Sequence, residues 1–291
     1  MKNCLVIMVF VLLSLGAGFS KGAEPHDVIE TFEHGFINWT QGLLVSKGVG
    51  APPAQPSGSH ENDQVMTLNV SRIHALKNML SVMLHTRLRA NISVGDIAAE
   101  SEIMMAQIES LAKGAKVVRQ EYLSDGTVEI TLQLNMFGGF SQLVLPGEIK
   151  QIEPIKTVSG AKPSAFGNGA DPIPESGTKI FSGLVVDARG TKVLPAMAPA
   201  IMDENGKEVY GEAFVSREFA VQKGMSKYVR DIKAAQTDSS VAHNPLTVKG
   251  LRSDAIVPSG IFISNADASK IRSASEHLSF LKKCRVIIVM D

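Results

Sequence analysis

Two apolar runs near the end of the chain, Gly260-Ile-Phe-Ile-Ser264 and Arg285-Val-Ile-Ile-Val-Met290, define its clearest structural unit. Neither run alternates with polar residues, which is the pattern of a strand covered on both faces of a sheet. The stretch Asn265–Leu281 between them is long enough for a helix, with Asn265 as its cap. Strand, helix and strand predict a right-handed βαβ crossover, so we expect the two apolar strands to pair in parallel.

The sequence before this unit predicts further strands and one long helix. A buried-type strand begins at Gly183. A hairpin turns at Asn205-Gly206, because both residues tolerate the positive φ of a tight turn. We expect one helix over Arg217–Ala235 and another strand from Asn244.

The first half of the chain predicts a small α+β unit. We expect a strand over Asn38–Val45 that ends at Lys47–Gly50, and a hairpin of Lys116–Leu123 with Thr127–Met136. Two helices are expected, one from Asn62 or Asp63 to His85 and one over Asp96–Lys113. The apolar residues of the first helix at helical spacing predict its buried face: Val70, Ile73, Leu76, Leu80, Met83 and Leu84.

Proline and glycine alternate from Gly147 to about Gly177, and this composition predicts a semi-extended linker. The fold class is therefore α+β or α/β. We expect two small domains, 24–146 and 178–291, each a sheet covered by helices and joined by the linker 147–177.

Residues 1–23 have the layout of a secretory signal peptide. Lys2 precedes an apolar run from Leu5 to Leu15, and small residues follow it. The run is too short for the ~20 residues of a membrane span. Cleavage after Gly22 or Ala23 would export the mature chain to the periplasm or the medium, where it could lie peripherally at the outer membrane.

The charge balance gives no reason to expect nucleic acid as a partner. Removal of residues 1–23 takes away two lysines and no acid, which leaves 27 basic and 29 acidic residues from the original 29 of each. Cys284 is then the only cysteine, so no intrachain disulfide can form. Its place beside an apolar run predicts a small buried residue.

No motif in the sequence identifies a catalytic, cofactor or metal site. Gly48-Val49-Gly50 lacks the following helix that a phosphate loop needs, and it predicts a flexible strand exit. Asp187 and Arg189 flank a strand end, where α/β sheets often carry sites, and a charge pair closing a turn is the favoured interpretation. A periplasmic hydrolase using Asp187, or a carbohydrate-binding module using Trp39, are the alternatives.

One stretch resembles a known bacterial envelope pattern. It consists of Trp39-X-X-Gly42, Gly48-X-Gly50 and a helix carrying Ser71-Arg72-X-X-Ala75. Over about residues 36–136 it is similar to the LPP-twenty lipoprotein family and to the N-terminal domain of flagellar assembly protein T. This chain departs from the pattern in having no lipidated cysteine and in carrying Ser71 for an alanine.

The resemblance implies a non-catalytic envelope protein that binds other envelope or surface-assembly proteins. The positions that carry it are candidates for binding or structural roles: Trp39, Gly42, Gly48, Gly50 and Arg72. Asp187 and Arg189 are added from the strand end.

Overall fold

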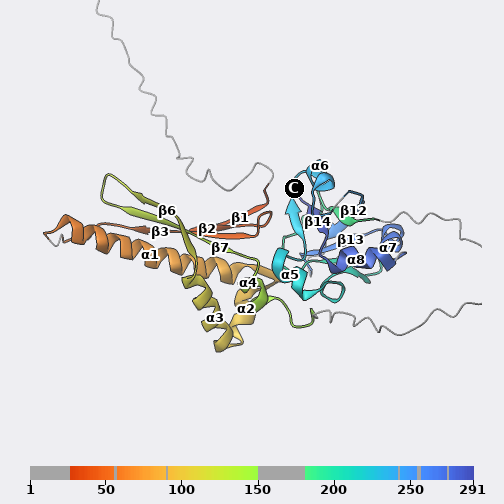
Figure 1. Cartoon of the computed structure of the whole chain (residues 1–291), viewed down its shortest axis with the longest axis horizontal. Coiled ribbons are helices and arrows are strands. Elements are labelled where there is room, and N and C mark those ends of the chain that lie inside the picture. Colours follow the sequence, from red (N-terminus) through yellow and green to blue (C-terminus); the bar gives the residue numbers. More distant parts are fainter. Residues whose placement is uncertain are drawn as a thin grey trace, which may run out of the picture.

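The computed structural model describes residues 27–55, 58–89, 91–149, 181–241, 243–253, 257–273 and 275–291, without the side chains of 275–278. The predicted signal peptide and the predicted linker beyond residue 149 lie outside these ranges. The described residues form an N-terminal part (27–149) and a C-terminal part (181–291), each with its own sheet and helices (Figure 1). The predicted class, mixed α and β with helix-covered sheets, is confirmed.

The N-terminal part is built on a five-stranded antiparallel sheet in the order β1-β2-β3-β7-β6. Its strands are β1 (Ile29–Phe32), β2 (Gly35–Asn38), β3 (Leu43–Gly50), β6 (Lys116–Tyr122) and β7 (Val128–Asn135). The helices are α1 (His60–His85), α2 (Val94–Ala99), α3 (Glu102–Lys113) and α4 (Gly139–Val144). A two-stranded ladder of β4 (Arg87–Arg89) and β5 (Ile92–Ser93) follows α1.

Helix α1 lies unusually close to strand β3, because small residues meet on both sides. A Cβ added to Gly48 would stand 2.2 Å from the backbone N of Ala75 and from the backbone O of Ser71. The Ser71 hydroxyl donates to the carbonyl of Gly48 at 2.9 Å, and the Ser46 hydroxyl donates to that of Ala75 at 2.8 Å. Gly48 and Gly50 therefore serve close packing, and the predicted flexible strand exit is wrong.

The predicted buried face of α1 is wrong in the first half of the helix, where Val70 and Ile73 are exposed, while Leu76, Leu80 and Leu84 pack against the core. The helix buries Thr67, Ser71, Ala75, Met79, Val82 and Met83. Of the six apolar residues predicted to face inward, only Met83 is fully buried, and Ile73 is 63% exposed. The apolar pattern failed here because the buried surface is small and partly polar, which allows the backbones to approach where larger side chains could not.

Element boundaries in the N-terminal part differ from the prediction at two turns. The predicted strand Asn38–Val45 is interrupted by a turn at 39–42, where Gly42 has a φ of +65°. The predicted helix Asp96–Lys113 is two helices, because the hydroxyl of Ser101 accepts the N–H of Met104 and begins a new helix. The predicted hairpin of β6 and β7 is confirmed, with Val128, Ile130 and Leu132 buried at alternate positions.

We expect Gly48→Ala to lower the free energy of unfolding by about 1–3 kcal/mol, because the added methyl group would overlap the backbone of α1. Urea unfolding followed by circular dichroism measures the change. Gly147→Ala is the matched control, since no atom lies within 4 Å of its added Cβ. Equal stability of the two variants would contradict the close contact.

The C-terminal part is built on a seven-stranded mixed sheet in the order β10-β9-β13-β12-β8-β14-β11. Its strands are β8 (Gly183–Asp187), β9 (Ala200–Met202), β10 (Glu208–Tyr210), β11 (Lys227–Val229), β12 (Pro245–Ser253), β13 (Gly260–Ile263) and β14 (Val286–Val289). The helices are η1 (Glu212–Phe214), α5 (Arg217–Lys223), α6 (Ile232–Thr237), α7 (Asn265–Arg272) and α8 (Ser275–Lys282). The hairpin predicted at Asn205-Gly206 is confirmed.

The predicted pairing of the last strand is wrong. β14 pairs in parallel with β8 and β11, and β12 and β8 separate it from β13, to which it runs antiparallel. The unbroken apolar runs predicted burial on both faces correctly: all four residues of each strand are buried. Burial of both faces does not determine which strand lies beside β14, however. The chain that leaves β13 passes β12 and β8 before it re-enters the sheet.

Two predicted helices are broken, each at a local signal. Arg217–Ala235 contains Gly224, whose φ of +81° ends α5, and residues 227–229 form strand β11 on β14. A carboxylate oxygen of Asp231 then accepts the N–H of Ala234 at 2.7 Å and begins α6. Asn265–Leu281 is divided into α7 and α8 after Arg272, and Leu281 is buried as predicted. The side chain of Leu278 is not described.

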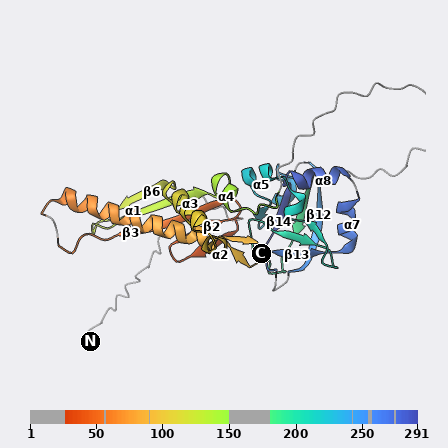
Figure 2. The same ribbon diagram turned by 90° about the horizontal axis from the view of Figure 1, so that it is seen from below.

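The two parts lie next to each other (Figure 2). They are joined by a shared core and by direct backbone contacts. The Trp39 ring meets the Tyr228 ring edge to face at 5.9 Å, and the Thr40 hydroxyl donates to the carbonyl of Tyr228 at 2.6 Å. The Tyr228 hydroxyl both accepts from the N–H and donates to the carbonyl of Ala196, at 3.0 and 2.8 Å. Backbone N–H groups of Met197 and Ala198 donate to the carbonyls of Arg87 and Leu88.

Because the core is continuous, we expect the two parts to unfold in one transition. Trp39 is the only tryptophan, so its fluorescence reports on the junction, while far-ultraviolet circular dichroism reports on the whole chain. The two signals should have coincident midpoints in urea. Tyr228→Phe should lower both midpoints and reduce the free energy of unfolding by about 1–3 kcal/mol, because buried backbone groups of Ala196 lose their partner. Separate midpoints would show that the junction does not couple the parts.

Candidate functional site

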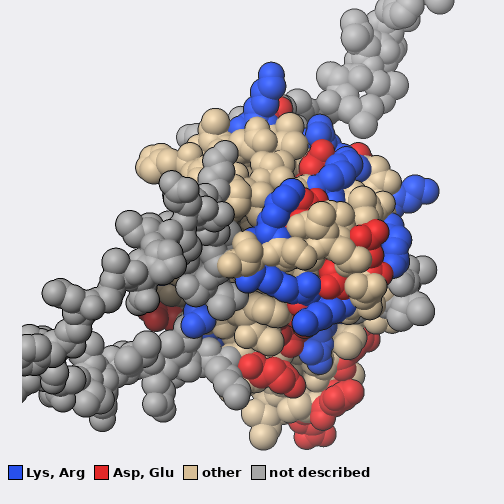
Figure 3. Space-filling view, turned by 90° about the vertical axis from the view of Figure 1, so that its right-hand side faces the viewer, with Lys and Arg blue, Asp and Glu red and all other residues tan. Residues whose placement is uncertain are grey.

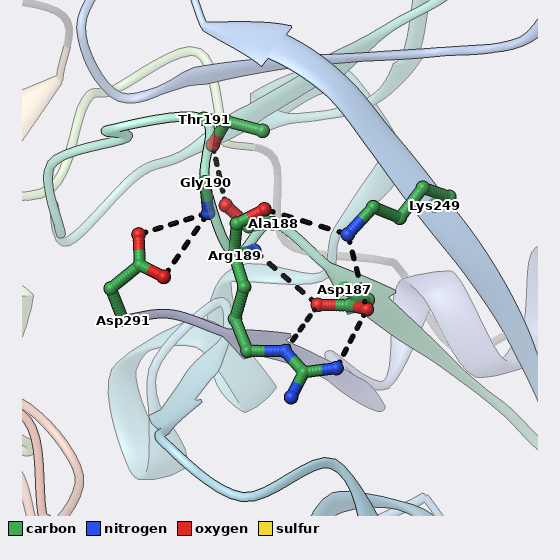
Figure 4. Close-up of polar contacts among 7 residues, drawn as sticks. All are labelled: Asp187, Ala188, Arg189, Gly190, Thr191, Lys249 and Asp291. Atoms are coloured by element: carbon green, nitrogen blue, oxygen red, sulfur yellow. Dashed lines mark hydrogen bonds and ion pairs between the residues drawn. The ribbon is translucent and has the colours of Figure 1, made fainter.

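Asp187 lies at the carboxyl end of β8, level with the ends of the parallel strands β14 and β11. Figure 4 shows its carboxylate held between two bases. Nε of Arg189 lies 2.8 Å from one oxygen and Nη2 lies 2.9 Å from the other, while Nζ of Lys249 approaches at 3.3 Å. Arg189 is the main cause of a low Asp187 pKa, about 2, and the same pair raises the pKa of Arg189.

The turn after Asp187 is closed by the same cluster (Figure 4). The N–H of Gly190 donates to both carboxylate oxygens of Asp291, at 3.1 and 2.9 Å, and the Thr191 hydroxyl donates to the carbonyl of Ala188. Asp187 is thus an ionised partner of Arg189, in agreement with the predicted charge pair. The hydrolase alternative loses its only support, because this carboxylate is paired with Arg189 and Lys249.

Asp203, another acid of this part, has a structural role. Asp203 accepts the N–H groups of Asn205 and Lys207 in the hairpin turn and pairs with Nη1 of Arg272 at 2.9 Å. Figure 3 shows acidic and basic side chains next to one another over this end of the molecule. Among the residues with described coordinates, no three His, Cys, Asp or Glu side chains are grouped as metal ligands.

Trp39 does not form an exposed aromatic platform. It is 3% exposed, and its Nε1 donates to a carboxylate oxygen of Glu30 at 3.0 Å. Its ring lies in the junction against Tyr228. The carbohydrate-binding alternative therefore also falls, and the predicted core-edge position of Trp39 is the better description.

The remaining predicted positions belong to the fold of the N-terminal part. Gly42 permits the turn before β3, and its α-carbon faces the ring of Phe137. Gly48 and Gly50 lie under α1. Arg72 is exposed on α1, next to the buried Ser71. The structure brings Gly48, Gly50 and Ser71 together, while Arg72 points away from them.

A groove that the sequence did not predict lies between the β1–β2 hairpin, the end of β3 and α1. Its volume is about 840 Å³, and its lining is mainly apolar, with Phe32, Phe36 and Val45 among the residues. Strand β3 is twice as long as β2, so its last residues have no partner on that side within the sheet. Side chains of α1 cover this edge: His74 Nδ1 lies 2.7 Å from the carbonyl O of Val49, and Asn78 Nδ2 donates to that of Lys47.

Exposed apolar side chains are concentrated on the N-terminal part. Ten of the twelve large hydrophobic residues exposed in the described chain belong to it, so this part is the candidate for binding a macromolecule. Apart from Val49 and Ile103, these residues lie on two surfaces. Helix α1 carries Val65, Met66, Val70 and Ile73, and the β6 edge carries Val117, Val118, Tyr122 and Leu123.

The geometry thus defines a protein with a helix-covered antiparallel sheet followed by a mixed sheet with helices on both faces. The model of one protein family matches residues 183–291, which is the C-terminal part from the first residue of β8. That family is described as the second domain of Treponema pallidum Tp0624, so this part of the chain is similar to that domain. The match lies outside residues 36–136, where the resemblance to envelope proteins remains a prediction. No curated protein matches the chain.

We expect the Asp187 ion pair to make the free energy of unfolding depend on pH in the acid range. The carboxyl group titrates near 3.8 in the unfolded chain and at about 2 in the fold. Its contribution of about 2 kcal/mol is therefore complete above pH 4 and disappears as the pH falls through 2. Asp187→Asn should be less stable than wild type by this amount at pH 6, and the difference should close by pH 2.

Chemical unfolding at a series of pH values measures this difference. Glu218→Gln is the control, because Glu218 is an exposed carboxylate whose removal should leave the pH dependence unchanged. A gap between wild type and Asp187→Asn that stayed constant from pH 6 to pH 2 would contradict the pairing.

Proposed function

We propose that this protein is an exported, non-catalytic component of a bacterial cell envelope, in the periplasm, in the medium or peripheral at the outer membrane. It acts by binding other envelope or surface-assembly proteins through its N-terminal part. Support for export comes from the signal-peptide pattern of residues 1–23. Among the helices with described residues, none has the length and apolar character needed to cross a bilayer.

The observation that carries the binding role is the apolar stripe on the outer side of α1. Met66, Val70 and Ile73 recur at spacings of four and three residues, so they share one face of the helix. All three are exposed, although apolar residues on a long helix normally face a core. Further along the same face, Leu80 and Leu84 are partly buried and pack against the core. A partner helix could extend this packing over the exposed half.

Two further points support an envelope role. Asp187 is paired with Arg189 and Lys249, so the hydrolase alternative has no free carboxylate there. Trp39 is buried, so the carbohydrate-binding alternative has no exposed ring there. The resemblance over residues 36–136 implies an envelope or motility assembly, and the family matched by residues 183–291 is described from a bacterium.

Fractionation of the native host tests export. We expect an immunoblot to detect a form that begins at Ala23 or Glu24 in the periplasm, the outer-membrane fraction or the medium. A cytoplasmic full-length product would contradict the proposal. Deletion of residues 5–15 is the control, because a chain without the apolar run should stay inside the cell.

Site-specific photo-cross-linking tests the binding surface. A photoreactive residue at Ile73 should give a discrete cross-linked band with an envelope protein in the living host, because this side chain projects from the apolar stripe. The same residue in place of Glu218 on the C-terminal part is the control and should give none. Ile73→Glu should abolish the function of the partner assembly without lowering the amount of exported protein. Identical cross-linking at both positions would contradict a specific surface.

A further inference from the structure

Strand β6 forms one edge of the N-terminal sheet, and no described strand pairs with its outer side (Figure 1). Six of its seven residues are exposed, so neither face is covered by a helix. Proteins usually shorten, twist away or cover such an edge, because unpaired N–H and C=O groups are a template for another strand. This edge is seven residues long, and its register with β7 shifts between Val117 and Arg119, so the stretch with regular geometry is Arg119–Tyr122.

The register of the sheet shows which backbone groups of β6 point outward. The N–H of Leu123, just after β6, donates to the carbonyl of Thr127, just before the partner strand β7. Hydrogen-bonded residues alternate along an antiparallel ladder, so Glu121 and Arg119 also bond to β7. The N–H and C=O groups of Gln120 and Tyr122 therefore face away from the sheet and are available to a further strand.

The side chains of β6 alternate in the same way. Residues paired across two strands point to the same face, so Gln120 and Tyr122 share the face of α1 with Ile130 and Val128 of β7. Arg119 and Glu121 share the opposite face, where Nη2 of the arginine lies 2.6 Å from the carboxylate. One face of the edge is thus neutral and the other carries one charge of each sign.

We propose that β6 pairs antiparallel with β6 of a second copy of this chain, with the two-fold axis at Gln120, which joins the two sheets into one. In this register Gln120 lies opposite Gln120 of the second copy. Arg119 of each copy lies opposite Glu121 of the other. The four charges then alternate in sign around the axis, so every neighbouring pair attracts.

The charges exclude the two adjacent registers. Antiparallel pairing that uses the same outward backbone groups can also be centred at Arg119 or at Glu121. The first register places two arginines opposite each other and the second places two glutamates, and like charges directly opposite are destabilising. Of these three registers, only the one centred at Gln120 places opposite charges across the axis, which favours a second copy over an unrelated strand as the occupant.

This pairing is independent of export and of the α1 stripe, and it can be tested on the chain without residues 1–23. Sedimentation equilibrium at increasing concentration should show a monomer–dimer equilibrium for this protein. Arg119→Glu and Glu121→Arg should each weaken the dimer by at least about tenfold, because each places two like-charged pairs across the axis. Lys77→Glu on α1 is the matched control and should dimerise as wild type does.

The two weakened variants should restore each other. A mixture of Arg119→Glu and Glu121→Arg chains brings two glutamates of one copy opposite two arginines of the other, so a heterodimer should form with about the wild-type affinity. The ion pair within one chain cannot explain this result, because it is lost in both variants. Circular dichroism checks that each variant is folded. A monomeric wild type, or a mixture that stays monomeric, would overturn the proposal.

The register has its own test. Gln120→Cys should form an intermolecular disulfide on mild oxidation, because residues opposite each other in a hydrogen-bonded pair have α-carbons about 5.5 Å apart. Lys116→Cys is exposed on the same strand but lies far from the axis, and it should stay reduced. Native Cys284 is buried and does not interfere. Equal cross-linking of the two variants, or cross-linking of Lys116→Cys alone, would overturn the two-fold axis at Gln120.

Discussion

The close contact between α1 and β3 determines most of the N-terminal part. It depends on side chains that are nearly absent: Gly48 and Gly50 on the strand, opposite Ser71 and Ala75 on the helix. A helix held this near to the sheet by small residues turns its larger apolar side chains elsewhere. The same position places α1 over β3 and β7 and leaves β6 uncovered. Both candidate binding surfaces therefore result from the close contact between α1 and β3. An α1 with a conventional apolar face would have buried the apolar stripe that is now exposed.

The C-terminal part holds the N-terminal part in place. Its central strands are buried on both faces, with α6 packed on one side and α7 and α8 on the other. The Trp39–Tyr228 contact and the bonds from Arg217 to the carbonyls of Gln142 and Pro146 attach the N-terminal part to it. Each contact joins residues far apart in the sequence, so the junction forms only when both parts are folded. The ion pairs of Asp187 also stabilise the C-terminal part, since they close a turn beside the end of β14.

The sequence predicted the elements whose signals are local. Alternation along residues 128–134 and the Asn205-Gly206 turn led to the right structure, as did the pairing of Asp187 with Arg189. The unbroken apolar runs correctly predicted burial on both faces. Prediction failed where tertiary contacts decide. Hydropathy could not show that α1 buries serine and threonine, and it could not tell which strand would receive β14. Gly224 was the visible signal against one long helix after Arg217, because glycine at positive φ ends helices. The groove beside β3 follows from the unequal lengths of β2 and β3, which are known only from the fold.

The two edges of the N-terminal sheet are unequal, and this inequality limits growth. The edge opposite β6 is β1, which has four residues and is bounded by a turn, so it offers little length to an incoming strand. Two sheets joined at β6 would expose β1 at both ends. Such an assembly is closed by its own symmetry, because the adhesive edge is used up when the second copy arrives. A sheet with two long edges would instead add copies without limit and become a fibre. The short β1 strand would thus end such an assembly at both sides.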